Sequence, residues 1–186
     1  MVFGGVQRTL FAGGLVGRVS AFSAGLGQGA SAKASSCSAE VDFSVETLQH
    51  VQTRGFYIGG LFGAVDGVLD VAESQAVTSV KTRLRINDFV FGGLVGKAGG
   101  ATSAKLSTAV SHLKMDFHRA ALVGGLAGYA ASPLQIEDCK VIIDGTLGEG
   151  SKAFGLVGSA PASSSAARVV VDDFLALSGP ARPAGA

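Results

Sequence analysis

Apolar and polar residues alternate with a period of two in several stretches of this chain. The clearest are residues 80–86 and 113–118, where apolar or small side chains occupy every second position and mostly charged ones lie between them. Residues 41–46 alternate in the same way. Successive side chains of a strand point to opposite faces, so this pattern predicts strands with one buried face. A helix would instead scatter the charges of Lys114, Asp116 and His118 around its circumference.

A glycine-rich motif recurs between these stretches. Its fullest form is Gly92-Gly93-Leu94-Val95-Gly96, and near copies stand at residues 13–17, 59–63, 124–128 and 154–158. The intervals between their starts are 46, 33, 32 and 30 residues. Self-similarity at such a period indicates a repeat array in which each unit must stack on its neighbours to bury its apolar face.

The residues that follow each motif keep one register. Fifteen positions after the first glycine come Ser74, Ser107, Cys139 and Val169, with Cys37 joining them once a loop is removed from the first repeat. A unit of about 32 residues with two or three short strands predicts an all-β fold, a right-handed parallel β-helix (β-solenoid) of about five coils. Equivalent residues would then lie ~4.8 Å apart from coil to coil.

The motif predicts how the interior is built. Glycine permits a positive φ or a close backbone contact where the chain turns from one sheet to the next. The motif leucines are expected to stack as one interior column: Leu15, Leu61, Leu94, Leu126 and Leu156. A second column is expected from the residues just upstream: Phe11, Tyr57, Val90 and Leu122.

This reading divides the chain into three parts. Residues 1–10 form a degenerate N-terminal cap, residues 11–177 form the solenoid, and residues 178–186 form a flexible tail. The first repeat is longer than the others, and its extra residues are assigned to a loop at residues 21–33, which is rich in Gly, Ala and Ser. Long loops of compact repeats often serve function, so this loop is expected to contact a partner.

The motif, followed about fifteen residues later by a short strand such as residues 36–41, resembles the GLUG repeat. That repeat is found in large surface and adhesin-like proteins and beside the catalytic region of some immunoglobulin-cleaving peptidases. The resemblance spans roughly residues 11–177, but the chain lacks the usual Asn before the Cys-like position and has fewer tyrosines. It implies a non-catalytic repeat scaffold.

Composition removes several classes of function. With 47% apolar residues and a formal net charge of +1 over 186 residues, the chain lacks the basic excess that phosphate-backbone binding needs. Nucleic acid is therefore not expected as a partner. The longest apolar run, residues 120–131, is too short to span a bilayer. The N-terminus shows no secretory signal, which favours an intracellular, cytoplasmic or cytoskeletal location over the cell surface.

Candidate chemistry is sparse. Gly92 to Lys97 has one residue too few between its glycines for a phosphate loop, and Ala98 follows the lysine. His50, His112 and His118 have no Cys or second His at metal-ligand spacing, so neither a metal nor another cofactor is expected. His118 is assigned to the charged outer row, and His112 to an inward position or a bend.

The chain has two acidic pairs, Glu137-Asp138 and Asp172-Asp173. Enzymes with a β-helix fold that cleave polysaccharides use carboxylates of this kind as general acid and general base. The two pairs fall in different rows of the repeat alignment. We expect them to be solvated turn carboxylates.

One surface feature points to binding. Lys81, Arg83, Arg85 and Lys114 are expected to lie on one face of adjacent coils, where they either pair with acidic neighbours such as Asp42 or bind an acidic protein surface or anionic glycan. The sequence thus favours a structural scaffold, a rigid rod docking onto other proteins in a large assembly. A cell-surface adhesin-like module and a carbohydrate-active β-helix enzyme are the alternatives.

Overall fold

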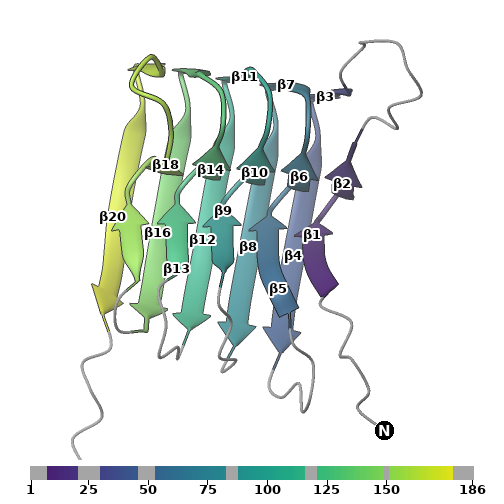
Figure 1. The fold of residues 1–186 in the computed structure, drawn as a ribbon. Coiled ribbons are helices and arrows are strands. Elements are labelled where there is room, and N and C mark those ends of the chain that lie inside the picture. The colour runs from purple at the N-terminus through teal and green to yellow at the C-terminus, as the bar shows by residue number, and fades with distance from the viewer. Residues whose placement is uncertain are drawn as a thin grey trace, which may run out of the picture.

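The structure, a computed structural model, describes residues 8–20, 30–45, 53–82, 88–115, 121–148 and 151–177. Within these ranges the chain forms twenty strands and no helix. The strands make four parallel sheets of five strands each, and every sheet takes one strand from each coil (Figure 1). The predicted all-β parallel solenoid is confirmed.

The four sheets are named A to D in the order in which the chain visits them. Sheet A contains β1 (Arg8–Gly13), β5 (Thr53–Gly59), β9 (Phe89–Gly92), β13 (Ala121–Gly124) and β17 (Lys152–Phe154). Sheet B contains β2 (Val16–Val19), β6 (Phe62–Val65), β10 (Val95–Ala98), β14 (Ala127–Ala130) and β18 (Val157–Ser159). Sheet C contains β3 (Ser31–Ser35), β7 (Val68–Ala72), β11 (Thr102–Lys105), β15 (Leu134–Glu137) and β19 (Ser165–Ala167). Sheet D contains the long strands β4 (Ser38–Val45), β8 (Gln75–Thr82), β12 (Thr108–Met115), β16 (Lys140–Leu147) and β20 (Val170–Leu177).

Each coil therefore has four strands rather than the expected two or three. The glycine motif separates the strands of sheets A and B, and a second corner separates the strands of sheets C and D. Several boundaries also move: residues 8–10 of the expected cap belong to β1, and residues 31–33 of the expected loop belong to β3. Residues 1–7, 21–29 and the tail 178–186 lie outside the described residues.

The long strands of sheet D confirm the predicted alternation and register. Ala39, Ala76, Ala109, Val141 and Val171 are register partners across the five coils. Along β8 and β12 the side chains alternate between the interior and the outer face, with Val80 and Leu113 buried and Lys81 and Lys114 exposed. The helical alternative is excluded for these residues.

At the glycine motif, the structure shows close approach rather than unusual backbone angles. A Cβ on Gly93 would lie 2.1 Å from the carbonyl oxygen of Gly125 and 2.7 Å from Cβ of Ala109 in sheet D. None of the motif glycines is among the described residues with positive φ. The turn between sheets A and B is thus pressed against sheet D, where only glycine leaves enough room.

The corner between sheets C and D uses a left-handed residue without glycine. Its members have φ values between 49° and 53°: Ser36, Glu73, Leu106, Asp138 and Arg168. This conformation is costly for residues with a Cβ. It is supported at the next position, where the Ser74 hydroxyl donates to the Ala72 carbonyl at 2.7 Å and accepts from the Cys37 amide at 3.2 Å. Ser107 repeats both contacts one coil later.

The expected leucine column is present and its backbone is continuous. The first four motif leucines each donate the amide hydrogen to the leucine carbonyl of the next coil, at 2.8 to 3.0 Å. Leu61, Leu94 and Leu126 are buried, Leu156 is partly buried, and Leu15 is 42% exposed. Leu15 is more open because, among the described residues, a coil covers it on one side only.

The second expected column is present, but it faces outward. Phe11, Tyr57, Val90 and Leu122 are register partners, but they point outward from sheet A. The interior positions are taken by the residues on either side of them, such as Phe56 and Ile58 in β5, which are at most 1% exposed. In an apolar run, the face that is buried depends on the register of a single residue.

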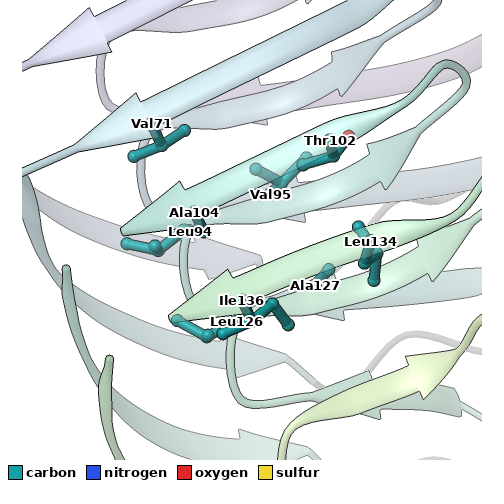
Figure 2. Close-up of a pocket in the computed structure, with 9 residues that line it drawn as sticks. All are labelled: Val71, Leu94, Val95, Thr102, Ala104, Leu126, Ala127, Leu134 and Ile136. Atoms are coloured by element: carbon teal, nitrogen blue, oxygen red, sulfur yellow. The ribbon is translucent and has the colours of Figure 1, made fainter. Parts of the chain in front are cut away.

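Sheets B and C enclose a small cavity of about 20 Å³ (Figure 2). Its lining side chains are apolar except for Thr102, whose hydroxyl donates to the Gly100 carbonyl at 3.2 Å. A buried water needs two to four polar partners, so this space is a dry packing defect rather than a ligand site. Figure 2 labels the nine lining residues, among them Leu94 and Leu126 of the leucine column.

Candidate interaction surface

The outward column of sheet A lies against sheet B of the following coil. Strand pairs β1 and β6, β5 and β10, and β9 and β14 are all in contact. Val90 faces outward and yet is only 9% exposed, and its Cγ1 lies 2.6 Å from the point that a Cβ on Gly128 would occupy. The outer faces of sheets A and B therefore pack on each other along the stack.

A row of aromatic and cationic side chains forms where these faces meet. The rings of Phe11 and Tyr57 stack with centroids 5.4 Å apart and planes 13° from parallel. The Arg18 guanidinium carbon lies 4.8 Å from the Phe11 ring centroid, and the Lys97 ammonium nitrogen lies 5.6 Å from that of Tyr57. We call these four residues, with Tyr129, the aromatic row.

Electrostatics hold the aromatic row in place. The Arg18 guanidinium donates from Nε to a carboxylate oxygen of Asp66 at 2.8 Å. Partial burial, and then the nearby carboxylate of Asp88 and phenol of Tyr129, raise the pKa of Tyr57. The Tyr57 phenol therefore stays protonated at neutral pH and can both donate and accept a hydrogen bond.

The aromatic row was not found from the sequence. Both tyrosines of the chain belong to it, and Tyr129 is 37% exposed. Its members come from five strands and are separated by up to 118 positions between Phe11 and Tyr129. The predicted column of Phe11 and Tyr57 pointed to part of it, but the sequence did not show that this column faces outward.

The expected basic patch is only partly placed. Lys81 and Lys114 are register partners on the outer face of sheet D, and both side chains are exposed. Arg83 and Arg85 lie outside the described residues. Lys81 also interacts with another group.

The histidine assignments change in one case. His112 faces outward from β12 and lies 2.9 Å from a carboxylate oxygen of Asp144, its register partner. The expected inward position or bend was wrong, because His112 falls on the outer half of the alternation. His50 and His118 lie outside the described ranges. In the described part of the chain, no group of three His, Cys, Asp or Glu side chains gathers at a metal-binding distance.

The acidic pairs occupy two different settings. Glu137 and Asp138 stand at the corner between sheets C and D, where the Arg168 guanidinium bonds both carboxylates and Lys105 bonds Glu137 at 3.0 Å. Hydrogen bonds from Lys105 and Arg168 lower the pKa of Glu137, and the bond from Arg168 lowers that of Asp138.

The expectation that the second pair lies in a turn was wrong. Asp172 and Asp173 belong to β20, and their register partners Ile142 and Ile143 show that they point to opposite faces of sheet D. Two neighbouring residues of a strand cannot direct their carboxylates at one bond. Asp172 and Asp173 therefore do not form an acid–base pair of the kind that glycoside hydrolysis uses, and the carboxylates of Glu137 and Asp138 both bond the Arg168 guanidinium.

Comparison with known proteins adds no assignment. No protein family, curated protein or solved structure matches this chain. Within the described residues, no helix is long and apolar enough to cross a membrane.

Proposed function

We propose that this chain is a non-catalytic interaction scaffold, a rigid solenoid that docks onto other proteins in a larger assembly, with the aromatic row as its docking surface. The observation that supports the proposal is the gathering of Phe11, Tyr57, Tyr129, Arg18 and Lys97 on one outer surface. Tyr and Arg are enriched among the residues that contribute most to protein–protein binding. Their side chains combine apolar area with a polar group.

The solenoid suits such a role because its surface is fixed by backbone ladders. Every coil is hydrogen-bonded to its neighbours in all four sheets. A surface built on strands is pre-organised, so little conformational entropy is lost when a partner binds.

The test is affinity capture from the native cell with the intact chain as bait. We expect the double variant Tyr129→Ser/Lys97→Ser to lose specific protein partners, whereas Lys81→Ser/Lys114→Ser on sheet D keeps them. Both variants leave the interior unchanged. If the row variant captured the same proteins in the same amounts as the wild type, the aromatic row would not be the docking surface.

The adhesin-like alternative is tested through the basic patch. Lys81 and Lys114 lie side by side on sheet D, and like charges directly opposite each other on neighbouring strands are unfavourable unless another group compensates them. Binding of a sulfated or sialylated glycan to the wild type, lost in Lys81→Ser/Lys114→Ser and weakened by salt, would favour that alternative over a protein-docking scaffold.

A further inference from the structure

Three neighbouring coils place Ser79, His112 and Asp144 in one outward column of sheet D. His112 is the register partner of Ser79 in β8 and of Asp144 in β16. Equivalent residues of adjacent parallel strands lie ~4.8 Å apart, so each of these side chains is next to the following one. Serine, histidine and aspartate are the residue types that serve as nucleophile, base and orienting carboxylate in acyl transfer.

The Asp144 carboxylate orients the imidazole of His112. Nδ1 of His112 lies 2.9 and 3.0 Å from the two carboxylate oxygens. A carboxylate only accepts hydrogen bonds, so in the neutral ring Nδ1 carries the proton and Nε2 keeps its lone pair. The two nitrogens lie on nearly opposite sides of the ring, so Nε2 is directed away from Asp144. Ser79 is the register neighbour of His112 on the side opposite to Asp144.

The neighbouring outward columns supply the other parts of an acyl-transfer site. Lys81 and Lys114 are exposed two positions further along the same strands, and their positive charge can stabilise an oxyanion. Two positions before Ser79, Val77 is 39% exposed and offers apolar surface to an acyl chain. The His112 side chain is 52% exposed, so an acyl donor can reach it from solvent.

We propose that Ser79 is a modification site that accepts an acyl group from an activated ester or thioester, with His112 as general base and Asp144 as positioning residue. The Ser79 oxygen forms a bond to the acyl carbon, and its proton passes to Nε2 of His112. The bond from the acyl carbon to the oxygen or sulfur of the donor then breaks, and His112 returns the proton to that leaving group.

This inference goes beyond the proposed docking function and concerns a different surface. One transfer to the chain's own serine modifies the scaffold and requires no turnover. In this structure the Ser79 hydroxyl is not hydrogen-bonded to His112, and such bonds often tighten only when the reactant is bound.

The test uses a fluorophosphonate, a reagent that reacts covalently with activated serine hydroxyls. Intact mass and peptide mapping should place one label on Ser79 of the wild type. Ser79→Ala should abolish this label, and His112→Gln should slow labelling about 100-fold, the size of a general-base contribution. Ser44→Ala is the matched control, because Ser44 is also an outward serine of sheet D but its register partner is Lys81. It should label at the wild-type rate.

Asp144→Asn tests the positioning role. The asparagine amide can donate to Nδ1, which favours the imidazole tautomer protonated on Nε2 and removes the base. We expect this variant to label as slowly as His112→Gln, and nitrogen NMR of the neutral imidazole to show the proton moved from Nδ1 to Nε2.

Four results would overturn the proposal. The label could map to a lysine in place of Ser79, or Ser44→Ala could lose as much label as Ser79→Ala. His112→Gln could label at the wild-type rate, or Asp144→Asn could leave both the rate and the tautomer unchanged. All of these substitutions change outward side chains, so circular dichroism should show the wild-type fold in each variant.

Discussion

At the residue scale, the contribution of a side chain to stability depends more on its position in the stack than on its residue type. Leu94 and Leu15 occupy the same place in the same motif, but Leu94 is 1% exposed and Leu15 is 42% exposed. Coils on both sides bury the first, whereas the second has a neighbour on one side. The repeat pattern predicts which residues share a column, and the number of neighbouring coils sets how much each of them contributes to stability.

Truncation of these two leucines should therefore differ. We expect Leu94→Ala to lower the free energy of unfolding by about 2 to 5 kcal/mol, because it enlarges a cavity that Leu94 already lines. Leu15→Ala should cost less than about 1 kcal/mol, as is usual for exposed positions. Urea unfolding of both variants measures the difference, and equal losses would show that the first coil is as well packed as the third.

Buried hydroxyls give a second prediction at this scale. Thr78 is fully buried and its hydroxyl has no hydrogen-bond partner, whereas the hydroxyl of Thr102 donates to the Gly100 carbonyl. Thr78→Val replaces the hydroxyl with a methyl group of similar size and should raise the free energy of unfolding by about 1 kcal/mol. Thr102→Val, the matched change, should lower it. A loss of stability in Thr78→Val would indicate an unrecognised partner for that hydroxyl.

At the scale of single elements, two corners hold each coil in shape by different means. The glycine corner relies on the absence of a side chain where the turn touches sheet D. In the first four coils the corner between sheets C and D relies on Ser and Cys side chains that bond the backbone, and Val169 takes that place in the fifth. An outer ion-pair cluster of Arg168, Glu137, Asp138 and Lys105 joins this corner of the last three coils.

The second glycine of the motif tests the first corner. Gly93→Ala would place a Cβ 2.1 Å from a backbone carbonyl, which cannot move without disturbing the next coil. At Gly155, the same position in the last coil, the nearest atom is a side-chain methyl carbon of Val171 at 3.0 Å. We expect Gly93→Ala to prevent cooperative folding and Gly155→Ala to lower the melting temperature only slightly. Similar melting temperatures would refute the close approach.

The ion-pair cluster predicts a dependence on pH. Hydrogen bonds from Lys105 and Arg168 hold the pKa of Glu137 below its ordinary 4.5, and that from Arg168 holds the pKa of Asp138 below 3.8. The stabilisation is present above these ordinary values and disappears as the pH falls through the lower values of the folded state. Arg168→Gln should thus lower the melting temperature slightly at pH 7.

The same substitution should have less effect at a pH below the lowered pKa values of the folded state, where the carboxylates of wild type and variant are both largely protonated. Lys33→Gln removes a longer and more exposed contact, 3.8 Å to Asp70, and is the control that should change little at either pH. If the effect of Arg168→Gln were the same at both pH values, packing rather than charge would explain it.

At the scale of the whole molecule, the stack keeps its cysteines apart. Cys37 and Cys139 share a corner position in the first and fourth coils, three steps or ~14 Å from each other. A disulfide needs Cα atoms within ~7 Å, and both thiols are free.

Thiol labelling of the folded protein tests this arrangement. Cys139 is 2% exposed and burial raises its pKa, so little reactive thiolate is available there, whereas Cys37 in the end coil is only partly buried. We expect Cys37 to react at least ~10-fold faster than Cys139 near pH 8. Intact mass under oxidising conditions should show no internal bridge, and a loss of two mass units would contradict the coil assignment.

The sequence by itself determined the architecture, because the period of the repeat can be read directly from the spacing of the motifs. The interval between motifs, the alternation along sheet D and the register of Ala76 with Ala109 all follow from short-range pattern. These features are local, and each coil obeys the same rules as the next.

Tertiary structure alone decided what lies outside the repeat rule. The aromatic row joins Phe11, Tyr57 and Lys97 from different coils, and it lies where the outer faces of sheets A and B pack on each other. The inward direction of Asp173 likewise depends on the register of β20 within the stack. A pattern of period two states that faces alternate, but which face is buried is set by contacts between residues far apart in the chain.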